Sequence, residues 1–112
     1  MVYDAIMRRR ATLVIDRKIT LEDGSIVQAV VWELPIPLKG SPHRYKYRLY
    51  YGNQGECLVR FDNEQGKGDH IHIRGVDAAP YVFQDIPTVL KDFRSEIEKQ
   101  GARYEKDNRN KE

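Results

Sequence analysis

The segment from Phe61 to His72 gathers the side chains of this 112-residue chain that are best suited to chemistry. His70 and His72 lie two residues apart, close to Lys67 and to three carboxylates. Histidine titrates near neutral pH, so one imidazole can act as a base while the other acts as an acid. RNA can be cleaved at its own 2′-hydroxyl by such a pair, with cations stabilising the charge on the phosphorane. Metal-independent RNA cleavage is therefore our first hypothesis for this segment.

A metal site is a second interpretation of the same histidines. The His-x-His spacing aligns two imidazoles along a strand, and a zinc site would need a third protein ligand. Asp69, Asp62 or His43 could supply that ligand, but the spacing matches no established metal motif. The sequence therefore predicts no metal and no other cofactor, and it assigns His43 to a loop without a direct role.

Two glycines flank Lys67 in the run Gly66-Lys67-Gly68. The run differs from a phosphate-binding P-loop, because the spacing and the following Ser or Thr are absent. We expect the glycines to form a tight hairpin turn with Lys67 at its tip. The backbone amides of such a turn could also bind one phosphate group.

Alternating polar and apolar residues predict five strands, at 11–19, 26–34, 44–51, 57–62 and 70–74. The third has the most regular pattern, with three cations and Tyr50 at even positions and three tyrosines and Leu49 at odd positions. If Ile71 and Ile73 join the core, then His70, His72 and Arg74 share the cationic face. Trp32 is assigned to the core.

We expect the strands at 44–51 and 57–62 to pair so that Leu49 faces Val59. The same register places Arg48 opposite Arg60, which is unfavourable unless an anion lies between them. This pairing is our first indication of a ligand-binding face.

A helix should follow the strands. Asp85 is a suitable N-cap, and Gly101 is a suitable stop. Ile86, Val89, Leu90, Phe93 and Ile97 form one apolar stripe. The predicted fold is therefore α+β, an antiparallel sheet of about four to six strands with a C-terminal helix on one face. One domain is expected to span 1–101, followed by a charged, disordered tail at 102–112; the segment 1–10 is left open between a helical turn and an edge strand.

Overall composition excludes several classes of protein. The formal charge is only +2, so the chain as a whole is not a strongly basic nucleic-acid binder. No apolar run is long enough to span a membrane, and no secretory signal is evident. The single cysteine, Cys57, allows no intrachain disulfide, which favours a cytoplasmic setting.

The chain resembles the TumE family of toxin–antitoxin toxins from about Ala11 to Ile97. The resemblance rests on His43-Arg44-Tyr45-Lys46-Tyr47-Arg48, on Asp62-Asn63…Gly66-Lys67-Gly68-Asp69-His70-Ile71-His72, and on a late helix with Asp92-Phe93. It implies a growth-inhibiting cytoplasmic toxin, made beside a DNA-binding antitoxin that neutralises it. RNA cleavage remains an inference from the chemistry of the residues.

Two other functions stay open at this point. The chain could inhibit a nucleic acid or protein by binding alone, or it could transfer a nucleotidyl or phosphoryl group to RNA or protein; self-association into a homodimer is also left open. For the ribonuclease hypothesis the residues fall into three sets. The catalytic residues are His70, His72, Lys67 and Asp69; the phosphate-binding residues are Arg44, Lys46, Arg48, Arg60, Arg74, Gly66 and Gly68; the supporting residues are Asp62, Asn63 and Tyr45.

Overall fold

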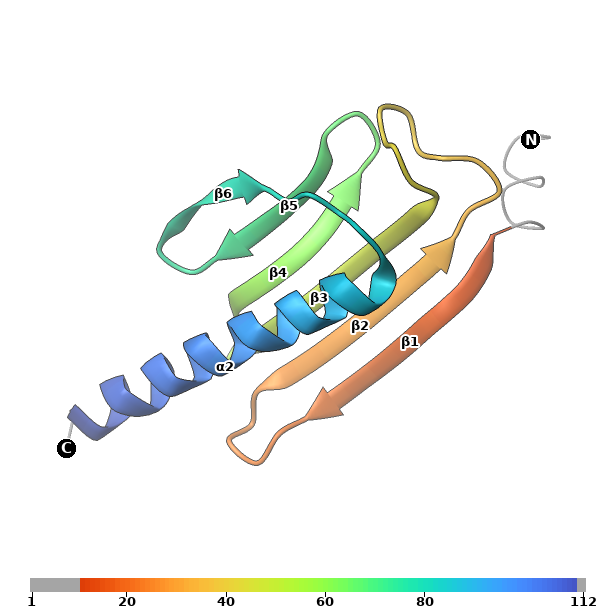
Figure 1. The fold of residues 1–112 in the computed structure, drawn as a ribbon. Helices are drawn as coiled ribbons and strands as arrows, with labels where there is room; N and C mark the ends of the chain where they lie inside the picture. The colour runs from red at the N-terminus through yellow and green to blue at the C-terminus, as the bar shows by residue number, and fades with distance from the viewer. Residues whose placement is uncertain (1–10, 111–112) are drawn as a thin grey trace.

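The computed structural model describes residues 11–110, with side chains through residue 101, so the segment 1–10 lies outside the described residues. The described chain forms a six-stranded antiparallel sheet, in which the strands follow chain order, and one helix (Figure 1). The elements are β1 (Thr12–Thr20), β2 (Ile26–Glu33), β3 (Tyr45–Asn53), β4 (Glu56–Glu64), β5 (Gly68–Ile73), β6 (Val76–Pro80) and α2 (Ile86–Asn110). The predicted α+β fold is confirmed.

Five of the six strands agree with the sequence prediction to within about two residues at each end. The sixth, β6, is not among the strands predicted from the sequence. It is rich in Asp, Ala and Pro, which are uncommon in strands. Its position explains why these residues are tolerated, because β6 is an edge strand and Pro80 stands at its end.

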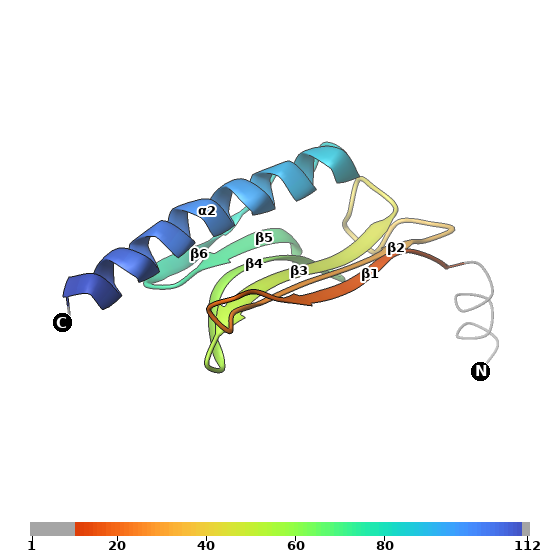
Figure 2. The ribbon, with the colours of Figure 1, turned by 90° about the horizontal axis from the view of Figure 1, so that it is seen from below.

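Helix α2 covers one face of the sheet, and no described element covers the other (Figure 2). Odd-numbered residues of β2, β3 and β4 point toward the helix and form the core with its apolar stripe. Fully buried members of this core are Val31, Tyr47, Leu49, Val59, Phe61 and Val89. Even-numbered residues of the same strands lie on the face without a helix, which we call the open face. Leu58 is an exception, because it stands at the β3–β4 bulge and is buried in the core.

The predicted register of β3 and β4 is wrong by two residues. Leu49 pairs with Phe61, and Arg48 pairs with Asp62 instead of Arg60. The hairpin closes through a two-residue turn at Gln54 and Gly55, both with positive φ, and a bulge follows Tyr51. A shift of two preserves which face each side chain occupies, but it removes the repulsion that first suggested an anion.

Helix α2 begins as predicted and ends later than predicted. The Thr88 backbone N–H donates to the Asp85 carboxylate at 2.7 Å, and hydrogen bonds from Thr88 lower the pKa of Asp85. The helix continues through Gly101 to Asn110, so the predicted stop is wrong. A single glycine costs a helix only about 1 kcal/mol, which its neighbours can offset. The final turns extend past the sheet (Figure 1), and a tail separate from the folded domain stays a prediction.

No helix among the described residues is both long and apolar enough to cross a membrane. Helix α2 has the length to cross a bilayer, but its sequence is too polar.

Candidate functional site

Strand β5 separates the predicted site residues onto two faces of the sheet. His70 pairs with Asp62 and His72 pairs with Arg60 on β4, and these four side chains share the open face. Asp69 and Ile71 alternate with the histidines and point toward the helix. The structure therefore brings the two histidines together with Arg60 and Asp62, but it does not bring Asp69 to them.

The open-face histidines line a pocket of about 360 Å³, which we call the histidine pocket. The two imidazole centroids are 6.4 Å apart. Asp62 contacts two side chains at once, with Oδ1 3.5 Å from His72 Nε2 and Oδ2 3.0 Å from Arg60 Nε. The Arg60 contact is an ion pair without hydrogen-bond geometry. The residues lining the pocket are Arg60, Asp62, Glu64, Lys67, His70, His72 and Ala78.

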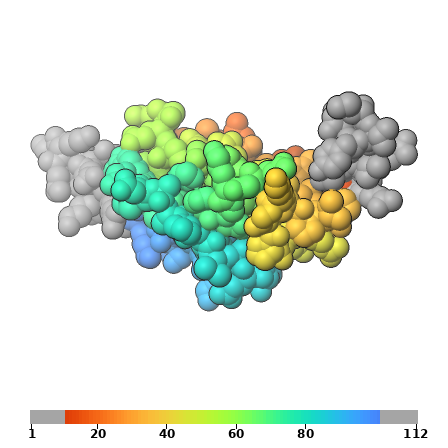
Figure 3. Space-filling view, turned by 90° about the horizontal axis from the view of Figure 1, so that it is seen from above, coloured from red at the N-terminus to blue at the C-terminus, as the bar shows by residue number. Residues whose placement is uncertain are grey.

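Lys67 stands at the tip of the turn between β4 and β5, as predicted, and its side chain is 73% exposed. Gly66 and Gly68 both have positive φ, which the turn requires. The Gly66 N–H donates to the Lys39 carbonyl at 3.0 Å, and the Lys67 N–H donates to the Glu64 carbonyl at 3.1 Å. Figure 3 shows the yellow loop that contains residue 40 in contact with this green turn. Two of the turn amides are thus already occupied, and the glycines serve to shape the turn.

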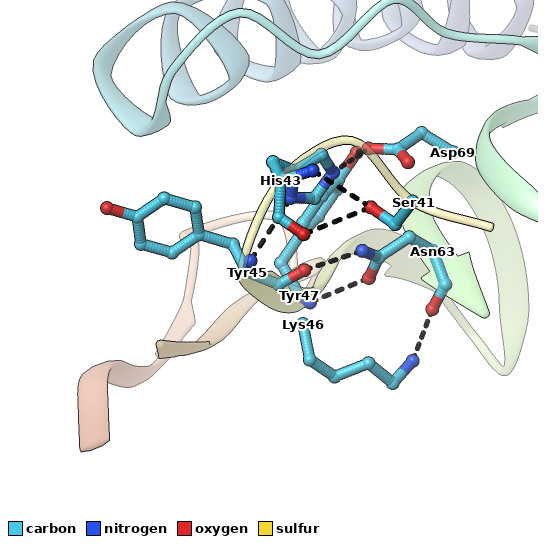
Figure 4. A network of polar contacts seen from close by, with 7 residues as sticks. All are labelled: Ser41, His43, Tyr45, Lys46, Tyr47, Asn63 and Asp69. Atoms are coloured by element: carbon cyan, nitrogen blue, oxygen red, sulfur yellow. Dashed lines mark hydrogen bonds and ion pairs between the residues drawn. The ribbon is translucent and has the colours of Figure 1, made fainter. Parts of the chain in front are cut away.

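Asp69 belongs to a second, interior cluster with His43 and Tyr47 (Figure 4). Its Oδ2 accepts hydrogen bonds from His43 Nε2 at 2.8 Å and from the Tyr47 hydroxyl at 2.6 Å. Burial and the neighbouring Asp69 carboxylate raise the pKa of Tyr47, so the phenol remains a donor. The carboxylate therefore orients the imidazole of His43 and contacts neither His70 nor His72.

The contacts of His43 define its tautomer. The Tyr45 backbone N–H donates to Nδ1 at 3.1 Å, so the ring proton lies on Nε2 and is donated to Asp69. The ring of Phe83 stacks on the imidazole, with centroids 3.9 Å apart. Both ring nitrogens are therefore occupied, and the side chain is only 11% exposed. We interpret the His43 cluster as a fixed support for the loop that leads into β3.

Asn63 joins β4 to β3 beyond the last paired residues of the two strands. Its Nδ2 donates to the Tyr45 carbonyl at 2.6 Å, and its Oδ1 accepts from the Tyr47 N–H at 2.9 Å. Lys46 Nζ donates to the Asn63 carbonyl. This fully buried amide replaces the missing ladder bonds between β3 and β4, and its supporting role at the site stays a prediction.

The remaining predicted residues lie away from the histidine pocket. Arg48 is exposed on the open face, with its guanidinium 5.5 Å from the centroid of the Tyr50 ring. Tyr45 lies on the helix-facing side and donates to Glu33 at 3.3 Å. Arg74 lies in the β5–β6 turn, 3.5 Å from Glu56. Arg44 precedes β3. Neither Arg44 nor Arg74 lines the histidine pocket.

Sequence reasoning missed two residues that the structure makes prominent. His43 was assigned no role, although it shares the odd-numbered parity of Tyr45 and Tyr47 and could have been placed on their face. Trp32 was assigned to the core, but it is 37% exposed on the open face, so that assignment is wrong. Its even-numbered parity with Val30 was the available signal.

No group of three His, Cys, Asp or Glu side chains suited to a metal ion occurs within the described range 11–101. His43 is separated from His70 and His72 by the sheet, because its partner Asp69 points to the opposite face. Of the three ligands considered from the sequence, Asp69 therefore lies on the other face with His43, and Asp62 alone shares the open face with both histidines.

These observations define the class of the protein. It is a small α+β protein with a helix on one face of its sheet and with histidines and cations on the other face. A family model described as Toxin TumE matches residues 3–101. The chain belongs to the TumE toxin family, so it is the toxin component of a toxin–antitoxin system and has an antitoxin as its implied partner. No curated protein and no solved structure matches it.

Proposed function

We propose that this toxin cleaves RNA in the histidine pocket by metal-independent acid–base chemistry. The observation that carries the proposal is the convergence of His70, His72, Arg60 and Lys67 on one pocket of about 360 Å³. Two imidazoles and two cations on one open surface are sufficient for cleavage at a 2′-hydroxyl. A sheet face that no described element covers can also admit an extended polymer.

The different surroundings of the two histidines suggest different roles. Asp62 Oδ1 lies 3.5 Å from His72 Nε2, where it can orient the ring and face the proton that a general acid must carry. No carboxylate of a described residue lies within ion-pairing distance of His70, which suits a base that must accept a proton. In this scheme His70 removes the proton of the 2′-hydroxyl, whose oxygen attacks phosphorus. The bond to the 5′-oxygen breaks, and His72 gives that oxygen its proton.

The phosphate would be held by cations on both sides of the histidines. Lys67 reaches the pocket from an exposed turn and can follow the phosphate as charge develops. Arg60 is fixed by Asp62, and the exposed Arg48 lies one strand further across the sheet. In this proposal Asp69 and Asn63 act as positioning residues, because they fix the β3 entry loop and the start of β5.

Binding without cleavage is a second candidate, and the distribution of cations favours it. Arg48 and Lys46 lie on β3, beyond the lining of the histidine pocket. A purely inhibitory toxin would depend on these cations and not on the histidines. Group transfer is less favoured, because the turn that would hold a donor phosphate has its Gly66 and Lys67 amides occupied.

The proposed setting follows from the family. An RNA target and an antitoxin partner both fit action in the cytoplasm, and we expect the antitoxin to bind DNA in addition to the toxin. Formation of a toxin homodimer is a further proposal, and sedimentation of the purified toxin would test it.

Purified toxin is expected to cleave single-stranded RNA equally well with and without EDTA. The reason is that imidazoles and cations supply every proton transfer and every charge contact in the scheme. Gel analysis of end-labelled RNA measures the rate. Cleavage that EDTA abolishes would instead indicate a metal nuclease. Tight, salt-sensitive binding without any product would support the non-enzymatic candidate.

A further inference from the structure

The only tryptophan of the chain, Trp32, lies on the open face and not in the core beneath helix α2. Trp32 is 37% exposed, and its strand neighbour Val30 points the same way. An exposed indole flanked by apolar side chains provides a flat stacking surface. The exposed position of Trp32 does not contribute to the core, because the core forms on the other face of the sheet. Binding of a ligand would explain why a large aromatic side chain lies there.

Trp32 lines a groove of about 320 Å³ between β2 and β3, which we call the tryptophan groove. Val30 and Trp32 supply its apolar surface, and Lys46 and Arg48 supply its charge. No carboxylate is among the residues that line it, which are Gln28, Val30, Trp32, Lys46, Tyr47 and Arg48. An apolar stacking surface with cations alone at its rim matches a nucleobase with its attached phosphate.

The Arg48 guanidinium is fixed beside the groove by the ring of Tyr50. Their separation is 5.5 Å, a cation–π contact. The Tyr50 side chain in turn lies against Gly52, where an added Cβ would stand 2.2 Å from the phenolic oxygen. Gly52 therefore allows Tyr50 to lie close to the strand. The result is a positioned cation without an ion-pair partner among the described residues.

The tryptophan groove and the histidine pocket lie on one continuous surface. Val30, Arg48, Asp62 and His70 stand directly opposite one another on β2, β3, β4 and β5. Three strand spacings separate β2 from β5, which is about 14 Å. Trp32 is one pair further along β2, opposite Lys46. An RNA strand crossing the sheet would span this distance with a few nucleotides.

We propose that the tryptophan groove binds an unpaired base of single-stranded RNA, stacked on Trp32, a few nucleotides from the bond cleaved at the histidines. This inference rests on the proposed function and defines its substrate as single-stranded. A duplex would keep its bases paired and could not offer one to the groove. An apolar segment of the antitoxin is the competing occupant, and the two cations among the lining residues favour the nucleic acid.

The test uses the full-length toxin and a dye-labelled oligonucleotide with 2′-O-methyl riboses, which cannot be cleaved at the 2′ position. Because Trp32 is the only tryptophan, its fluorescence reports the groove directly. We expect saturable quenching by the oligonucleotide, and anisotropy should show that Trp32→Ala weakens binding about tenfold to a hundredfold. Trp32→Phe should retain most of the affinity. Ile36→Ala, which removes an exposed apolar side chain from a loop, is the matched control and should change nothing.

A second probe separates stacking from a general loss of affinity. Oligonucleotides with one abasic position should lose affinity for the wild-type toxin at one position only, and the same change should have no effect on Trp32→Ala. Equal binding by wild type and Trp32→Ala, without quenching, would overturn the groove proposal and leave RNA cleavage standing. Quenching by the antitoxin but not by the oligonucleotide would overturn it in favour of a protein site. No oligonucleotide binding at all would overturn both proposals.

Discussion

Replacing His70 or His72 with alanine is expected to slow RNA cleavage by about 10²- to 10⁴-fold, the usual contribution of one general acid or base. Each variant should also relieve toxicity in growing cells. Stability should change by less than about 1 kcal/mol, because both side chains lie on the open face and the His72–Asp62 pair is partly exposed. End-labelled RNA measures the rate, and urea unfolding measures the stability.

His43→Ala is the internal control for these two variants. Its ring is buried and has both nitrogens occupied, so we expect a loss of stability instead of a selective loss of catalysis. If His70→Ala or His72→Ala cleaves RNA at the wild-type rate, that residue is neither the acid nor the base. If His43→Ala is stable but inactive, the site has been placed on the wrong face of the sheet.

Asp69→Ala is expected to destabilise the protein by about 3 kcal/mol or more, although the sequence grouped Asp69 with the catalytic residues. The carboxylate accepts hydrogen bonds from His43 and Tyr47, and its removal leaves two buried donors without an acceptor. Asp69→Asn keeps an acceptor oxygen and should cost less. The midpoint of urea unfolding, measured at constant pH, checks both values.

Asp62→Ala provides the matched comparison on the neighbouring strand. Asp62 contacts Arg60 and His72 on the open face, so its loss should reduce cleavage. Its side chain is only 13% exposed and the Arg60 Nε atom is buried, so the variant should also lose about 1 to 3 kcal/mol of stability. The two aspartates should therefore differ in their larger effect, with Asp69→Ala acting mainly on folding and Asp62→Ala mainly on the activity of the folded protein. An Asp69→Ala protein that unfolds at the wild-type midpoint would contradict the interior role assigned to this carboxylate.

Face assignments could be predicted from the sequence because they depend only on a two-residue period. The alternation in 44–51 placed the odd-numbered tyrosines inside and the cations outside, and the alternation in 70–73 placed both histidines on the cationic face. The same rule, applied strictly, would have moved Asp69 to the other face and Trp32 out of the core. The chemical type of Asp69 suggested the catalytic group and that of Trp32 suggested the core, whereas their positions in the alternation indicate the opposite faces.

The pairing register of β3 and β4 and the contacts of the β2–β3 loop could not be predicted from this two-residue period. The segment from Gly52 to Glu56 is compatible with several hairpin loops, and the two-residue turn is only apparent once Gln54 adopts positive φ. A shift of two residues left every face correct while exchanging Arg60 for Asp62 opposite Arg48. His43 reaches Asp69 only because the β2–β3 loop folds back over the sheet, and no local pattern encodes that path.

The ends of the cleaved RNA give the most direct test of cleavage by the open-face histidines. Attack by the 2′-hydroxyl leaves a 2′,3′-cyclic phosphate on one fragment and a 5′-hydroxyl on the other. The measurement is the end-group analysis of fragments from an RNA cleaved by purified toxin, beside an RNA with one 2′-deoxynucleotide at the cleaved position. We predict cyclic phosphate and 5′-hydroxyl ends, and no cleavage of the 2′-deoxy RNA. Fragments with 5′-phosphate ends, or cleavage of the 2′-deoxy RNA, would contradict the account.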